Sequence, residues 1–118
     1  MAPFDFRVQV KNGEPFPLLE PDFMFGVSGA PKAAIDGRGV YCGTGAGLQL
    51  TNPANVVELA VINGSQIAII TAFGAGGQTN SKNVPSAPGV QHVRFDFAGI
   101  YRVKFESMGS ELYLQTIS

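Results

Sequence analysis

The sequence predicts an all-β domain, a small antiparallel β-sandwich of seven to nine short strands. Apolar and polar residues alternate with a period of two in several segments, most clearly between residues 93 and 105. Fifteen glycines and eight prolines interrupt the chain often, which disfavours long helices, and no window repeats apolar residues at helical spacing. At 118 residues the chain can build one core but not two, so we expect a single domain over residues 1–118.

The N-terminal third predicts one strand and one irregular segment. Residues 4–10 alternate apolar and polar side chains, as in a strand with one wet face, and Asn12-Gly13 suits a tight turn. Residues 15–39 are Pro-rich, and their apolar side chains have no clear period. We expect this segment to pack as an irregular lid on its own sandwich, in preference to an arm that reaches a neighbouring subunit.

The middle of the chain predicts two short strands and then a hairpin. The short strands are residues 40–42 and 48–50, and the hairpin joins 56–62 to 66–73 around Asn63-Gly64-Ser65. Two registers are open. A two-residue turn pairs Val61 with Gln66, whereas a three-residue loop gathers one apolar face from Val57, Leu59, Val61, Ile67 and Ile69. Both faces of the hairpin are apolar in either register.

The C-terminal part predicts a long loop followed by strands with one solvent face. Residues 74–91 are polar and lack periodicity, and loops of this length are usually functional or disordered. In the strands, the predicted inward residues are Val93, Phe95, Phe97, Tyr101, Val103, Phe105, Leu112 and Leu114. The predicted outward residues include Arg94, Arg102 and Lys104, which we expect to pair with the carboxylates Asp96, Glu106 and Glu111.

One short string gives a hint of topology. Gly99-Ile-Tyr101-Arg-Val103 resembles the tyrosine corner of immunoglobulin-like Greek keys, and it is also similar to strands of tumour-necrosis-factor-type jelly rolls. The resemblance covers about ten residues. It implies a Greek-key sandwich, of jelly-roll or immunoglobulin-like type.

Scarcity of charge is the strongest indication of function. Residues 39–93 contain only two charged side chains, Glu58 and Lys82, and the whole chain is 14% charged against ~25% in typical domains. Because charge keeps exposed surface soluble, we expect much of this surface to be covered by copies of the same chain, in a homo-oligomer that is a trimer or larger. The predicted interface residues are Val56, Ala60, Ala68, Ile70, Ala72, Phe23 and Phe25.

Three functions follow, in order of preference. In size and composition the chain resembles phage or viral structural proteins, which implies a non-enzymatic assembly subunit such as a capsid decoration or tail-associated protein on a larger protein lattice. The alternative is an oligomeric lectin-like module whose loop 74–91 holds a carbohydrate through Gln78, Asn80, Lys82 and Asn83, with Tyr41 and Gln91 nearby. The third is a small enzyme with a site between subunits, tested at Cys42, His92 and Asp96.

Other classes of site have little support. The glycines at 43, 45 and 47 miss the spacing of a nucleotide-binding loop, and one cysteine with one histidine cannot build a metal site of those ligands. We therefore expect no cofactor. A net charge of −1 gives no footprint for nucleic acid, and no apolar run is long enough for a membrane span. Without a signal-like N-terminus, we expect a cytoplasmic location as synthesised, or a place in a virion.

Overall fold

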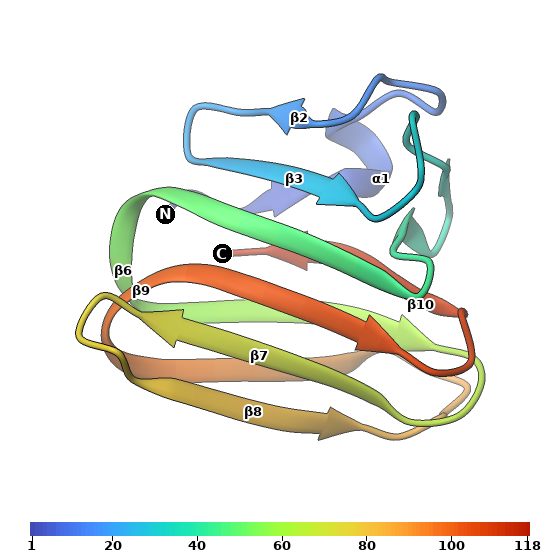
Figure 1. The fold of residues 1–118 in the computed structure, drawn as a ribbon. Helices are drawn as coiled ribbons and strands as arrows, with labels where there is room; N and C mark the ends of the chain where they lie inside the picture. The colour runs from blue at the N-terminus through green and yellow to red at the C-terminus, as the bar shows by residue number, and fades with distance from the viewer.

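The computed structural model describes all residues, 1–118, and confirms the predicted antiparallel β-sandwich. The chain forms ten strands and one helical turn (Figure 1). In chain order they are β1 Phe4–Asp5, α1 Phe6–Gln9, β2 Leu18–Leu19, β3 Phe23–Val27, β4 Ile35–Asp36, β5 Gly39–Tyr41, β6 Gly45–Asn63, β7 Ala68–Gly74, β8 Thr79–Val84, β9 Gln91–Ser107 and β10 Leu112–Ile117. The helix is too short to span a membrane.

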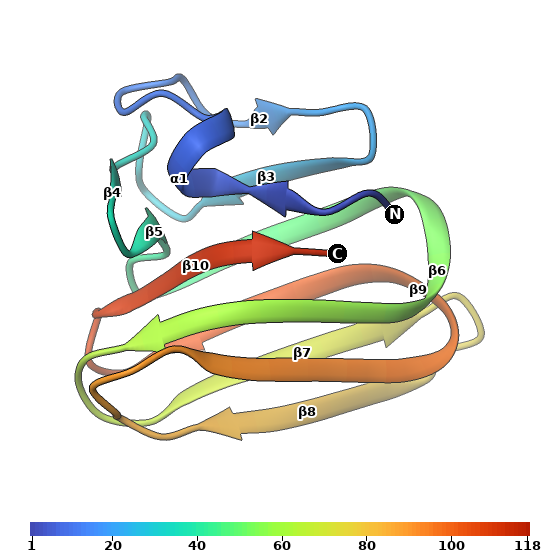
Figure 2. The same cartoon turned by 180° about the vertical axis from the view of Figure 1, so that it is seen from behind.

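Two long strands, β6 and β9, pair along most of their length and bend together, so that each contributes to both layers (Figures 1 and 2). The front layer contains β2, β3, residues 45–50 of β6, residues 102–107 of β9, β7 and β8. The back layer contains β5, β10, residues 56–63 of β6 and residues 91–96 of β9, with β1 and β4 at its margins. The pairing is irregular between Gln49 and Val56, around Pro53, which has no N–H to donate to the ladder.

The core lies between the layers and is built by alternate residues of each strand. Phe23, Phe25 and Val27 point inward from β3, and Val57, Leu59 and Val61 point inward from β6, as predicted for the latter three. Five phenylalanine rings stack in a chain of tilted and edge contacts with centroid distances from 4.9 to 6.2 Å; they are Phe4, Phe6, Phe23, Phe25 and Phe105. These contacts tie the N-terminal segment to the front layer.

The predicted N-terminal strand is wrong beyond Asp5. The Asp5 carboxylate accepts a hydrogen bond from the Arg7 N–H at 2.9 Å, and Gln9 Oε1 accepts one from the Asp5 N–H at 2.8 Å. This reciprocal capping turns the chain into α1. Phe6 is still buried, but Val8, which the strand pattern turned inward, is 79% exposed.

The predicted hairpin of residues 56–73 is also wrong, because its two strands do not pair. The second half of β6 lies in the back layer between β10 and β9, whereas β7 lies in the front layer between β9 and β8. The turn between them crosses the sandwich. Buried Asn63 fixes this crossing, since its Nδ2 donates to the carbonyls of Gln66 at 2.7 Å and Val84 at 2.9 Å.

The crossing reverses the predicted faces of β7. Ile67 is 40% exposed and Ile69 is half-buried, while the inward positions are Ala68, Ile70 and Ala72, each fully buried. The interface position predicted for these three, and for Phe23 and Phe25, is therefore wrong: all five fill the core of the chain itself. Of the predicted interface, only half-buried Val56 and buried Ala60 lie outside the core cluster, on the outer side of β6.

Three further segments differ from or refine the prediction. Residues 15–39 pack on their own sandwich, but β3 is a regular strand of the front layer. The predicted loop 74–91 contains strand β8, which pairs with β7 from Thr79 to Val84. Tyr101 is 37% exposed and Ile100 takes the inward position, because Gly99 at φ +74° shifts the alternation by one residue. Tyr101 therefore does not form the predicted buried corner.

Candidate functional site

The outer face of the front layer carries a strip without side chains. Gly26 of β3 and Gly47 of β6 are direct cross-strand partners on this face. A Cβ atom built on either residue would meet no atom within 4 Å, and neither has a positive φ. Neither packing nor backbone conformation therefore requires glycine here, and the consequence of the two glycines is open space above the sheet.

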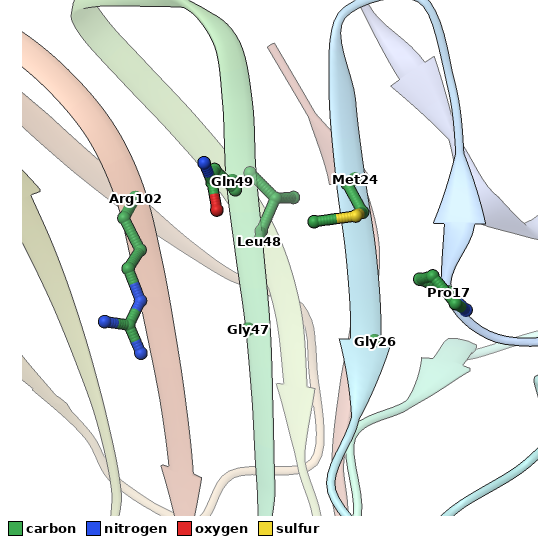
Figure 3. A pocket seen from close by; sticks show the side chains of 7 residues that line it. All are labelled: Pro17, Met24, Gly26, Gly47, Leu48, Gln49 and Arg102. Atoms are coloured by element: carbon green, nitrogen blue, oxygen red, sulfur yellow. The ribbon is translucent and has the colours of Figure 1, made fainter.

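That space belongs to a groove along β6, which we call the outer groove. It consists of three adjoining hollows. The central one is about 390 Å³ and lies over Gly26 and Gly47 (Figure 3). A second, of about 360 Å³, shares Gly47 and Arg102 with it and extends to Thr44. The third, of about 200 Å³, shares Met24 and Gln49 with it and extends to Thr51. Along the strand from residue 45 to 51 the groove is ~20 Å long.

The register of the sheet explains how the walls of the groove form. Leu19 pairs with Met24, Met24 with Gln49, Gln49 with Arg102, and Arg102 with Phe73, so one row of side chains crosses five strands. Their side chains make one wall, which is apolar at Leu19 and Met24 and polar at Gln49 and Arg102. Pro17 borders the central hollow on the side of β2, as Figure 3 shows.

The groove offers side-chain groups and almost no free backbone groups. Its floor strand β6 is paired on both sides, with β3 and β9, so its backbone N–H and C=O groups are used within the sheet. Gln49 is exposed and its amide makes no hydrogen bond within the chain. The hydroxyls of Ser28, Thr44 and Thr51 border the outer hollows.

Arg102 stands where the central and second hollows meet. Its guanidinium carbon lies 5.2 Å from the centre of the Phe73 ring, a cation–π contact on the outer face. The predicted ion pairs form for Arg94 with Asp96 and for Lys104 with Glu106, at 3.3 and 3.4 Å. Neither Glu106 nor Glu111 forms an ion pair with Arg102, and none of the five N–H groups of Arg102 donates a hydrogen bond within the chain.

The predicted ligand loop does not converge on one site. Asn80 and Lys82 share the inward-facing side of β8, where the Lys82 Nζ lies 5.7 Å from the centre of the Phe95 ring. Asn83 lies on the opposite, outer face of the same strand. Gln78 lies in the turn before β8 and accepts, through its backbone carbonyl, a hydrogen bond from the Gly74 N–H. These four residues line none of the hollows of the outer groove.

The candidate catalytic residues are not arranged as a catalytic site. Cys42 is buried in the core, and burial raises the pKa of its thiol to about 12, which leaves little thiolate at neutral pH. His92 is exposed on the outer side of the back layer. The Asp96 carboxylate forms an ion pair with the Arg94 guanidinium. No group of three or more His, Cys, Asp or Glu residues gathers in a geometry that could hold a metal ion.

Comparisons with known proteins give a few distant structural likenesses. No protein-family model matches the sequence, and no curated protein matches it. An exo-β-1,3-galactanase of Phanerochaete chrysosporium is similar at 19% identity and a TM-score of 0.46, over 98% of this chain but only 28% of the galactanase. A CBM35 domain from Cellvibrio japonicus is similar at 10% identity and a TM-score of 0.44, over 99% of this chain and 93% of that domain. Oxalate decarboxylase of Bacillus subtilis scores 0.33 at 18% identity, over 88% of this chain and 26% of the enzyme.

These scores carry no information about a ligand of this chain, and the outer groove must be assessed on its own geometry. Sequence reasoning missed the groove because the predicted strand begins at residue 48, which leaves Gly45 and Gly47 outside it, whereas β6 begins at Gly45. A usable signal existed: Ala46, Leu48 and Leu50 are apolar at alternate positions, which places Gly45, Gly47 and Gln49 on the other side of a strand.

Proposed function

We propose that this domain is a non-catalytic module that binds an oligosaccharide chain in the outer groove. The observation that carries the proposal is the open floor at Gly26 and Gly47, where two strands forgo side chains that would fit. Glycine in a strand interior costs stability of roughly 0.5–1 kcal/mol relative to alanine. Because neither packing nor backbone conformation requires glycine at these two positions, this loss of stability supports a binding role for the open space above them.

The lining favours a saccharide over other extended ligands. A peptide that adds to a sheet needs a free edge, but the floor strand is paired on both sides. A nucleic acid would need a run of cations, whereas Lys104 is already paired with Glu106. A sugar presents hydroxyls and apolar C–H faces, which match the Gln49 amide and nearby hydroxyls on one hand and Met24 on the other. Because no aromatic ring forms the floor, we expect weak affinity for each unit and a gain with chain length.

The test compares two exposed amides on the same sheet face. Gln49 lines the groove, whereas Asn83 lies on β8 at the far edge and belongs to the loop first predicted to bind ligand. Wild type, Gln49→Ala and Asn83→Ala are titrated calorimetrically with oligosaccharides of two to six units that are selected from a glycan array. We expect a loss of about tenfold for Gln49→Ala, with unchanged thermal stability, and none for Asn83→Ala. The reverse pattern, or an array without binders, would overturn the proposal.

A second candidate function is self-assembly, now through the back layer. Tyr41, Tyr113 and Ile62 are half-buried cross-strand neighbours on its outer side; further along β6 the same side carries Ala60 and Val56, with exposed Glu58 between them. No other strand or helix packs on this face, and the Arg38 guanidinium lies over Tyr113, 3.9 Å from the centre of its ring. Tyr41, Tyr113 and Ile62 thus form a small apolar patch outside the core that could support the predicted homo-oligomer, and nothing supports a capsid or tail role. Light scattering over a concentration series tests it: Ile62→Lys should lower the mass, and a wild-type monomer at every concentration would exclude it.

A further inference from the structure

We infer that the ligand of the outer groove carries an anionic group, and that Arg102 binds it at the junction of the central and second hollows. This inference rests on the proposed function and specifies the class of saccharide. The first observation is a contrast among the four arginines of the chain. Arg7 pairs with Asp5, Arg38 with Asp36, and Arg94 with Glu58 and Asp96, whereas Arg102 pairs with no carboxylate.

The second observation is the position of that unpaired charge. Arg102 is the only cationic residue that lines the central hollow, and it also lines the second one. Lys104 lines the second hollow too, but Glu106 lies 3.4 Å from its Nζ and compensates its charge. The uncompensated charge of this part of the groove is therefore the guanidinium of Arg102.

The third observation is that Arg102 is oriented before any ligand arrives. Its guanidinium carbon lies 5.2 Å from the centre of the Phe73 ring, and Phe73 is its cross-strand neighbour on β7. This cation–π contact restrains the guanidinium while its N–H groups, which make no hydrogen bond within the chain, stay able to donate in parallel to two oxygens of one anion. Less side-chain entropy is then lost on binding than for an exposed, unrestrained arginine.

Charge along the groove also has a direction. The third hollow, at the opposite end, is lined by Glu20, which makes no ion pair. An acidic substituent is therefore favoured beside Arg102 and disfavoured beside Glu20. The ligand that fits best has its anionic group beside Arg102 over Gly47, short of Glu106 at the Gly45 end, and neutral units toward Thr51. The shared chemistry is an anion on a sugar, and either a uronic acid carboxylate or a sulfate ester supplies it.

The test uses three tetrasaccharides of the same linkage: one with uronic acid units, its carboxyl-reduced neutral form, and a sulfated neutral form. Calorimetry at low and high salt is run on wild type, Arg102→Gln, Arg102→Lys and the matched control Lys104→Gln. For wild type we expect one anionic form to bind about tenfold or more tightly than the neutral form, with the advantage reduced by salt. Arg102→Gln should remove the advantage, so that this variant binds the anionic and neutral forms equally; Arg102→Lys should keep part of the advantage, and Lys104→Gln should keep most of it.

The outcomes separate this inference from the function on which it rests. Equal binding of neutral and anionic forms overturns the anionic group while the groove remains the site. An advantage that survives Arg102→Gln but is lost in Lys104→Gln also overturns it. If no form binds wild type, the proposed function fails and the inference fails with it. Preference for the carboxylate or for the sulfate form supports the inference and identifies the source of the anion.

Discussion

Filling the floor of the outer groove should raise stability and lower affinity together. In Gly47→Val the new Cβ meets no atom within 4 Å, and Gly47 has no positive φ that valine would strain. Removing glycine from a strand interior should then stabilise the fold by about 1 kcal/mol, since β-branched residues favour strands. For a domain of this size that corresponds to a rise in Tm of roughly 3–5 °C. The same side chain occupies the central hollow, so affinity should fall about tenfold or more, equivalent to ~1.4 kcal/mol.

Thermal unfolding followed by circular dichroism and calorimetric titration of the same oligosaccharide measure the two effects on one preparation. Gly26→Val, the cross-strand partner, should behave in the same way. Gly37→Ala is the control, because its Cβ would also meet nothing within 4 Å but it lies between β4 and β5, outside the groove. A fall in Tm for Gly47→Val would show that this face is not open. A rise in Tm with unchanged affinity would show that ligand does not occupy the groove.

Two further predictions concern the core. Ile70→Ala should lower the free energy of unfolding by about 2–5 kcal/mol, because Ile70 is fully buried. Ile69→Ala should lower it by less than about 1 kcal/mol, because Ile69 faces outward. Urea unfolding measures both values, and the opposite order would show that Ile69, as first predicted, faces the core. Burial raises the pKa of the Cys42 thiol from 9.0 to about 12, so between these pH values the unfolded chain loses a proton that the folded chain keeps. Stability should fall by up to about 1.4 kcal/mol per pH unit as pH rises through that window; Cys42→Ala should lessen the slope, and an identical slope would exclude the thiol as its cause.

The predictable part of the fold lay where alternation was long and one face was charged. Val93, Phe95, Val103 and Phe105 are buried as predicted, because charged neighbours between them leave only one possible inward side. The pattern failed at Tyr101. Gly99 adopts a positive φ and moves Ile100 to the inward side, and a bulge at Tyr101, between the pairs Gly74–Ile100 and Phe73–Arg102, restores the original phase at Val103.

The crossing between β6 and β7 could not be predicted from alternation. Both sides of β7 are apolar in sequence, so either assignment satisfied the pattern, and a turn such as Asn63-Gly64-Ser65 suits a hairpin equally well. The decisive contact is long-range: the Asn63 amide binds the carbonyl of Val84, on β8 of the other layer. No local pattern in the sequence predicts that contact. The interface residues Ala68, Ile70 and Ala72 were misplaced for this reason.

The scarcity of charge also acquires a different explanation. It predicted a surface covered by other copies, on the premise that exposed surface needs charge. In the structure much of the charge-poor segment is buried, and its exposed positions are mostly uncharged polar residues or glycines: Thr51 and Asn52 at the bend of β6, Thr79, Asn80, Ser81 and Asn83 along β8, and the half-exposed glycines of the groove floor. Hydroxyl and amide groups keep such a surface hydrated without charge. They are also the groups that exchange hydrogen bonds with water for hydrogen bonds with sugar hydroxyls at little net cost. The scarcity of charge, which first indicated self-assembly, therefore agrees equally well with a groove that binds an oligosaccharide. In such a groove the unpaired guanidinium of Arg102 would favour an acidic saccharide over a neutral one.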